Sequence, residues 1–99
     1  GFNPQGDGNV IRINIPALSG EVRQKMVSRI KELAEETRVS IRNVRRDGNK
    51  AADQAEKDKN LNEDLRDDLK NEIQDLTKKY ETSVNEAAQN REAEVMESR

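Results

Sequence analysis

The sequence contains no cysteine and no histidine, and Phe2 and Tyr80 are its only aromatic residues. Without cysteine the chain has neither a disulfide framework nor a thiol nucleophile. Without histidine it lacks the commonest metal ligand and the general base that titrates near neutrality. These absences argue against metal-dependent and triad-type enzymes. The scarcity of aromatic residues argues against a thick core and a deep apolar ligand pocket.

Long apolar runs are also missing, since none approaches the roughly 20 residues that span a bilayer. The 99 residues suffice for one domain. Charged residues (38%) outnumber apolar ones (31%), so the chain is either disordered or largely helical, and its periodicity must decide. The net charge of −2 conceals strong local asymmetry. Because the first residue is Gly1 and not Met, we expect a processed or truncated product.

The N-terminal residues predict a loop followed by one short strand. Residues 1–9 are rich in glycine, which is typical of turns. Residues 10–16 then alternate, with Ile11, Ile13 and Ile15 on one face of an expected half-buried strand. Pro16 ends this strand because proline cannot donate a hydrogen bond to a sheet. A lone strand is unstable in water, so we expect it to pair with a preceding segment or with another chain.

A long helix is expected over residues 20–57. Ser19 is a suitable N-cap, and Glu21 places a carboxylate at the positive end of the helix. Apolar or small residues recur at spacings of three and four, which indicates one narrow stripe along about 55 Å of helix. The stripe consists of Val22, Met26, Ile30, Leu33, Thr37, Ile41, Val44, Gly48, Ala51 and Ala55.

A second long helix is expected over residues 62–97, after a break near residues 57–60. Asn62 is its predicted cap, followed by two acids in the first turn. Its stripe consists of Leu65, Leu69, Ile73, Leu76, Tyr80, Val84, Ala87 and Val95. The short link makes the helices antiparallel. Two stripes do not close a core, so we infer a third helix from a preceding segment or a partner. The alternative is a two-stranded coiled coil that dimerises.

The segment with the most chemical information is residues 38–50, because it carries four arginines on one flank of the first helix. We call Arg38, Arg42, Arg45 and Arg46 the arginine ridge and expect it to be exposed. Arg38 has an acid, Glu35, three residues before it. The other three arginines have no acid three or four residues away, so their charges are expected to be free for phosphate. The competing interpretation is a ridge paired with acids of a neighbouring helix.

Other polar groups give weaker signals. Gly6-Asp7-Gly8 lacks the lysine and hydroxyl residue of a phosphate loop. Adjacent acids such as Glu63 and Asp64 diverge by 100° on a helix and do not converge on a metal. Lys78, Lys79 and Arg91 are interpreted as solubilising residues. Aromatic residues are not interleaved with the ridge, so base stacking on single strands is not supported.

The run from Arg38 to Asp47, RVSIRNVRRD, closely resembles the signature of the ribosome recycling factor family. Its surroundings follow the order of that family: GFNP at residues 1–4, IRI at 11–13, PALS at 16–19 and EAEVM at 92–96. The sequence departs from the usual pattern at Gly48, where alanine is common, and at Ala17, which replaces a frequent second proline. Neither departure touches the arginine ridge.

This resemblance implies an L-shaped protein with a long three-helix bundle and a small inserted α/β domain. Residues 1–16 would be a remnant of the small domain with one strand, residues 17–19 a hinge, and residues 20–99 part of the bundle. The first bundle helix and most of the small domain would lie outside this chain. The implied fold is mainly α, with two long antiparallel helices of an incomplete three-helix bundle and a short N-terminal β-strand.

The resemblance also implies a function without bond chemistry. Members of the family bind the post-termination ribosome and, with elongation factor G and GTP, promote splitting into subunits. The implied contacts with large-subunit ribosomal RNA are Arg38, Arg42, Arg45 and Arg46, with Arg45 foremost; the implied hinge comprises Pro16, Ala17, Leu18 and Ser19. No cofactor, metal, small-molecule substrate or membrane is implied. The full-length protein would be a monomer in the bacterial cytoplasm, or in an organelle of bacterial origin. A structural coiled-coil oligomerisation module without RNA binding remains the alternative.

Overall fold

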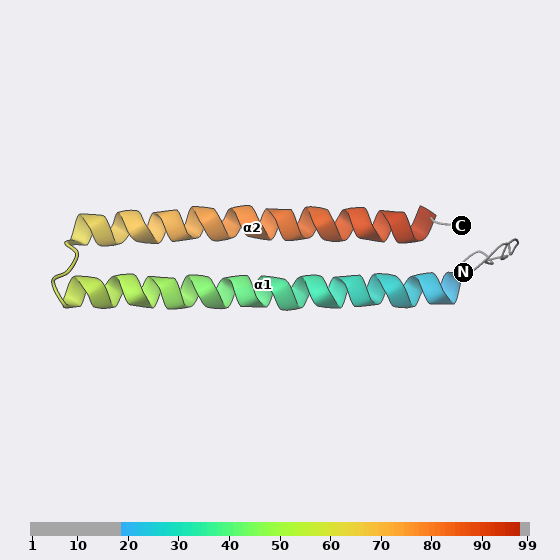
Figure 1. The fold of residues 1–99 in the computed structure, drawn as a ribbon, viewed down its shortest axis with the longest axis horizontal. Coiled ribbons are helices and arrows are strands. Elements are labelled where there is room, and N and C mark those ends of the chain that lie inside the picture. Colours follow the sequence, from blue (N-terminus) through green and yellow to red (C-terminus); the bar gives the residue numbers. More distant parts are fainter. Residues whose placement is uncertain (1–18, 98–99) are drawn as a thin grey trace, which may run out of the picture.

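The computed structural model describes residues 19–97, which form two long antiparallel helices (Figure 1). Helix α1 spans Gly20–Lys57 and helix α2 spans Glu63–Glu97, so the predicted mainly α hairpin is confirmed. No strand occurs among these residues. The strand predicted at residues 10–16 and the hinge residues 16–18 lie outside the described part of the chain. Neither helix is apolar enough along its length to cross a membrane.

The start of each helix is fixed by the cap that the sequence predicts. The Ser19 hydroxyl accepts a hydrogen bond from the backbone N–H of Val22 at 3.1 Å. The Asn62 side-chain oxygen accepts one from the backbone N–H of Leu65 at 2.8 Å. Each cap satisfies one of the backbone donors that the first turn of a helix leaves unpaired.

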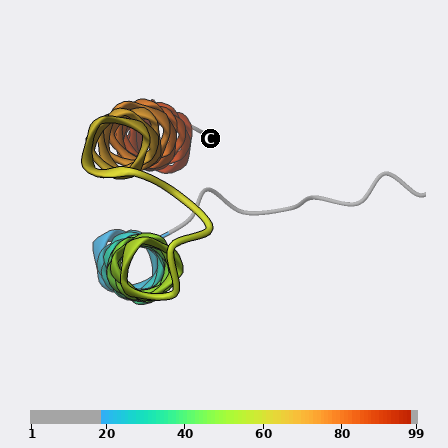
Figure 2. The same cartoon turned by 90° about the vertical axis from the view of Figure 1, so that its left-hand side faces the viewer.

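Helix α1 ends in a turn built around Lys59, which has a left-handed φ of 64°. The N–H of Lys59 bonds to the carbonyl of Glu56 at 3.0 Å, and that of Asn60 bonds to the carbonyl of Ala55 at 2.9 Å. This pair of bonds is the Schellman arrangement, in which glycine is the usual left-handed residue. The turn reverses the chain within a few residues and sets α2 beside α1 (Figure 2).

The line of contact between the helices, here called the seam, contains mainly small side chains. Its most buried residues are Val27, Ala34 and Ala52 of α1 with Thr77 and Val95 of α2. Gly48 also faces α2, because a Cβ atom added there would lie 3.1 Å from the Ile73 Cδ1 atom. Small residues let two helices approach closely, so the seam is thin and contains no large buried side chain.

The prediction of one apolar stripe on each helix is wrong in one respect. Several members of these stripes do not face the partner helix and are 38–65% exposed: Val22, Met26, Leu33 and Val44 on α1, and Leu65, Leu69, Leu76 and Tyr80 on α2. Each helix therefore has two adjacent apolar faces, one in the seam and one open. The spacing of three and four residues does not distinguish the two faces, because they lie within about 90° of each other on the helix.

The open faces of the two helices lie on the same side of the pair and form an apolar groove. One stretch of it is lined by Ile41 and Val44 of α1 with Leu76 and Tyr80 of α2. Another stretch, near the far end of the hairpin, is lined by Met26, Ile30 and Val95 among others. This exposed apolar surface agrees with the expectation that two helices of this sequence do not close a core.

Candidate nucleic-acid interface

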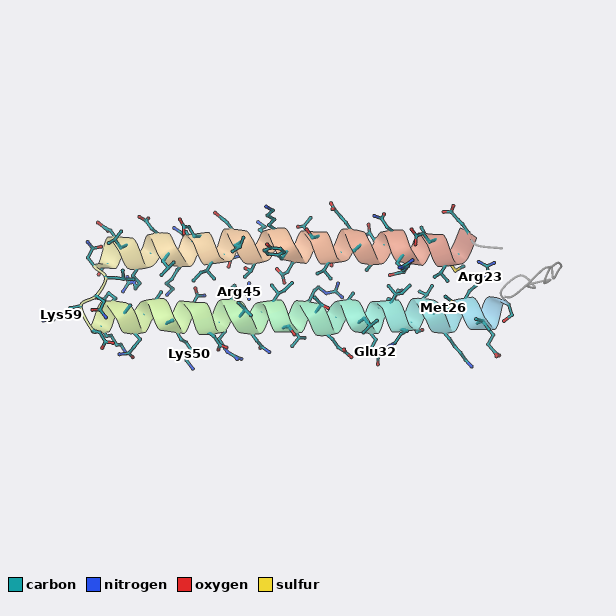
Figure 3. The ribbon with its side chains drawn as sticks, in the orientation of Figure 1. Arg23, Met26, Glu32, Arg45, Lys50 and Lys59 are labelled. Atoms are coloured by element: carbon teal, nitrogen blue, oxygen red, sulfur yellow. The ribbon has the colours of Figure 1, made fainter. Side chains whose placement is uncertain are left out.

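The arginine ridge lies in the middle of α1, on the side of the seam opposite the apolar groove. At 100° per residue, Arg45 and Arg38 are directed at the edge of the seam, and Arg42 and Arg46 progressively further outward. Arg45 lies on the α2-facing side of α1, whereas Glu32 and Lys50 lie on the opposite side (Figure 3). Arg46 is exposed, whereas Arg38, Arg42 and Arg45 are half-buried at the edge of the seam, so the ridge is less exposed than expected.

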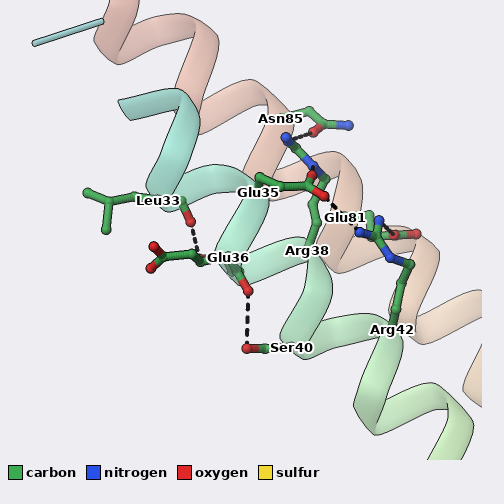
Figure 4. A network of polar contacts seen from close by, with 9 residues as sticks. Leu33, Glu35, Glu36, Arg38, Ser40, Arg42, Glu81 and Asn85 are labelled. Carbon is green, nitrogen blue, oxygen red and sulfur yellow. Dashed lines mark hydrogen bonds and ion pairs between the residues drawn. The ribbon is translucent and has the colours of Figure 1, made fainter. Parts of the chain in front are cut away.

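Glu35 bridges the first two arginines of the ridge (Figure 4). Its Oε1 atom accepts a hydrogen bond from Arg38 Nε and its Oε2 atom accepts one from Arg42 Nη2, each at 3.0 Å. Both arginines also extend across the seam to α2. Arg38 Nη1 donates to the Asn85 Oδ1 atom at 2.7 Å, and Arg42 Nη1 lies 3.9 Å from the Glu81 Oε2 atom.

The expected pair of Arg38 with Glu35 is therefore confirmed, but Arg42 and Arg46 do have acid partners. Arg42 reaches Glu35, seven residues earlier, because two full turns return to the same flank and the arginine side chain is long. Arg46 pairs with its neighbour Asp47 at 3.3 Å, where both side chains are more than 60% exposed. Counting only acids at three and four residues missed both arrangements.

Arg45 differs from the other three arginines. Its side chain makes neither a hydrogen bond nor an ion pair with any of the described residues. Its surroundings explain this difference, because polar pairs cross the same edge of the seam on both sides of it. These pairs, here called the ladder, are Arg38–Asn85, Arg42–Glu81, Asp53–Lys70 and Glu56–Arg66.

The register of the ladder places no acid opposite Arg45. The two residue numbers of each pair add up to 122 or 123, which is the signature of an antiparallel register. The same register sets Arg45 opposite Thr77 and Lys78. Thr77 is buried and its hydroxyl donates to the carbonyl of Gln74 at 3.1 Å, whereas Lys78 is exposed. The ladder thus has an electropositive position in its middle.

The ridge as a whole contains four guanidinium groups and three acids that pair with them, Glu35, Asp47 and Glu81. Hydrogen bonds from Arg38 and then Arg42 lower the pKa of Glu35 below its ordinary value. Exposed pairs of this kind contribute only about 0–1 kcal/mol each, so an external anion can exchange with them at small cost. This arrangement suits reversible binding of phosphate groups.

The remaining polar residues form no second site in the described part of the chain. No group of three or more acids comes close enough to hold a metal ion between residues 19 and 97. Of the hinge residues, only Ser19 is described, and there it is the N-cap of α1.

No sequence motif indicates the part that α2 plays in this interface. Asn85, Glu81 and Lys78 lie on separate turns of α2 and form no local motif. Their positions follow only from the register of the two helices, which the capped turn and the packing of Gly48 against Ile73 establish together. Knowing where α1 ends and α2 begins would have been enough to pair them approximately.

Comparison with known proteins identifies the family of the chain. The profile of the ribosome recycling factor family matches residues 1–96. A ribosome-recycling factor of Bacillus cytotoxicus is 46% identical over 97 residues, which is 98% of this chain and 52% of that protein. One of Pelobacter propionicus is 42% identical over the same coverage. One of Rhodopirellula baltica is 79% identical over 52 residues, which is 52% of this chain and 28% of that protein.

The described residues form a two-helix rod with an arginine-rich flank, and the proteins that the chain resembles are translation factors. The chain belongs to the ribosome recycling factor family. It spans about half the length of the curated relatives that it matches along its whole extent.

Proposed function

We propose that this chain is the helical part of a factor that binds the post-termination ribosome through large-subunit ribosomal RNA. With elongation factor G and GTP, it promotes splitting of the ribosome into subunits. The factor has no enzymatic activity of its own and acts in the bacterial cytoplasm as a monomer when full length. Residues 1–16 belong to a small second domain, and residues 17–19 are the hinge that lets the two domains rotate.

The observation that carries this proposal is the charge of the Arg45 side chain, which has no partner among the described residues although polar pairs cross the seam on both sides of it. Evenly paired side chains would indicate a purely structural edge. An arginine that faces Thr77 and Lys78 instead has its charge available for a phosphate group. Arg46, paired only with exposed Asp47, lies beside it, and Arg38 and Arg42 extend the positive flank along α1.

Binding to large ribosomal subunits tests the proposal. In the intact protein, Arg45→Ala is expected to weaken binding roughly tenfold, which corresponds to about 1.4 kcal/mol, and to reduce the dependence of log affinity on log salt by about one. Lys50→Ala is the matched control, because it removes the same charge from the opposite side of α1 (Figure 3). If the Arg45 variant binds like wild type at every salt concentration, the ridge is not the RNA contact.

The open apolar groove bears on the alternative of a coiled-coil oligomerisation module. In the proposed function a third helix, from the part of the protein outside this chain, covers the groove. In the alternative a second copy of the chain covers it and assembly is independent of RNA. Sedimentation of the intact protein with and without ribosomes separates the two: a monomer that associates with ribosomes supports the first, and a discrete homo-oligomer indifferent to them supports the second.

A further inference from the structure

Glu35 occupies the ridge in the way that a phosphate group would. Each of its two carboxylate oxygens accepts a hydrogen bond from a different guanidinium, Arg38 on Oε1 and Arg42 on Oε2. A phosphodiester also presents two charged terminal oxygens, and arginine pairs bind carboxylate and phosphate by the same fork of N–H donors. The side chain of Glu35 is more than half exposed, so the position that it fills is open to an incoming anion.

We propose that Glu35 is a built-in competitor of the RNA phosphate, and that binding exchanges its carboxylate on Arg38 and Arg42 for a phosphate group. This inference rests on the proposed function. It assigns two states to the ridge: a free state in which Glu35 holds two arginines, and a bound state in which Glu35 turns to solvent. Glu35 thereby limits the affinity of the ridge and favours release.

The exchange is asymmetric along the ridge. Arg45 has no acid to give up and makes the first contact with phosphate at no internal cost. Arg38 and Arg42 must first leave Glu35, although Asn85 and Glu81 keep their side chains directed across the seam. Asp47 cannot play the same part, because it pairs with Arg46 alone and at the longer distance of 3.3 Å.

The three acids also differ in what they would release. Glu81 reaches only Arg42, at 3.9 Å, and its side chain is 26% exposed. Glu35 is the one described acid that bonds two arginines of the ridge at once. Removing the Glu35 charge therefore frees more of the ridge than removing any other single charge. In agreement with this geometry, hydrogen bonds from both arginines lower the pKa of Glu35.

The test compares Glu35→Gln with Glu32→Gln in the intact protein. Glu32 is the matched control: it lies one turn earlier on the same helix and pairs with Arg29, three residues before it, on an exposed face away from the ridge. Both changes remove one negative charge from the same helix. Affinity for large ribosomal subunits is measured over a series of potassium chloride concentrations, and helix content is checked by circular dichroism.

Glu35→Gln is expected to bind threefold to tenfold more tightly than Glu32→Gln at low salt, and its affinity should fall more steeply as salt rises, because two more guanidinium groups then displace counterions. The gain should shrink when Arg42→Ala is present in the same protein. Equal affinities for the two glutamine variants would overturn the inference. Weaker binding by Glu35→Gln would overturn it too, since Glu35 would then position the arginines and not compete for them.

Arg45→Ala, measured in the same series, separates this inference from the function on which it rests. If Arg45→Ala weakens binding and Glu35→Gln does not strengthen it, only the competition by Glu35 is wrong. If Arg45→Ala binds like wild type, the ridge itself is not the interface.

Discussion

Replacing Gly48 with alanine is expected to raise the free energy of unfolding by about 0.5 kcal/mol. Glycine inside a helix is about 1 kcal/mol less favourable than alanine. The opposing effect is contact with α2, because the new Cβ atom would lie 3.1 Å from Ile73 Cδ1 and 3.7 Å from its Cγ1 and Cγ2 atoms. Favourable carbon contacts begin near 3.5 Å, so the Cδ1 methyl must move by a few tenths of an ångström.

Ile73 is half-buried, and its Cδ1 atom is the far end of a flexible side chain, so the methyl can turn away. Turning it off its preferred rotamer costs about 0.5 kcal/mol, at the low end of the usual range. The difference between this cost and the helix-propensity gain gives the expected net stabilisation. The measurement is urea unfolding of the intact protein, followed by far-ultraviolet circular dichroism.

A double-mutant cycle isolates the contact. Ile73→Val removes the Cδ1 methyl and retains both branches at Cβ, and by itself it should cost about 1 kcal/mol. In that background Gly48→Ala should give the full gain of about 1 kcal/mol, so the coupling between the two sites is about 0.5 kcal/mol. Equal gains in both backgrounds would refute the contact. Destabilisation in the Ile73 background would show that α2 cannot yield at this point.

Two further predictions concern the turn and the response to pH. Lys59→Gly should raise the free energy of unfolding by up to about 1 kcal/mol, because glycine adopts the left-handed φ of 64° without steric cost; a loss of stability in urea unfolding would contradict this. Because the pKa of Glu35 is lowered in the folded state, its contribution to stability is present above its unfolded pKa and is lost as pH falls through the folded value. Stability should therefore decline less on acidification in Glu35→Gln than in wild type, and parallel curves would argue against it.

The two helices could be predicted from the sequence because their determinants are local. Ser19 and Asn62 cap the helices that follow them, and the spacing of apolar residues at three and four is a property of each segment alone. The predicted start and end of α1 therefore agree with the structure, and α2 begins directly after its predicted cap. The left-handed Lys59 was not predicted, because glycine and asparagine are the residues that signal such a turn.

The division of each stripe into a seam face and an open face could not be predicted in the same way. Val27 and Ala34 are buried whereas their neighbours Met26 and Leu33 are 40–44% exposed. Hydrophobicity favours the larger residues for burial, but close approach of the helices favours the smaller ones. Which face meets α2 is decided by packing between the two segments, and a pattern in one segment carries no information about it.

The partners of the arginines also differ in whether they are local in the sequence. The pair of Arg38 with Glu35 spans one turn and was expected from spacing alone. The contact of Arg42 with Glu81 depends on a residue 39 positions later and on the antiparallel register. The ridge was therefore identifiable from the sequence as a cluster of charges, whereas the acid partners of Arg42 and Arg46 were not.

The unpaired state of Arg45 depends on the residue opposite it, and Lys78→Glu makes that dependence measurable. The register of the ladder places residue 78 across the seam from Arg45, so a glutamate there would give Arg45 an acid partner. The new pair should stabilise the helix hairpin by about 0.5 kcal/mol, the usual value for a partly exposed ion pair. It should also weaken binding to large ribosomal subunits, because Arg45 would then have an acid to give up before it could contact phosphate.

Lys79→Glu is the matched control for the expectation that Lys78→Glu raises stability and weakens binding. Lys79 is the next residue on α2 but points away from the ridge, where it lines a shallow surface with Glu72 and Asp75. The same change of charge there adds an acid among acids, so it should not stabilise the hairpin, and it should weaken binding only through the general charge of the protein. If the two variants lose the same affinity and neither gains stability, Arg45 does not face residue 78, and the availability of its charge must have another cause.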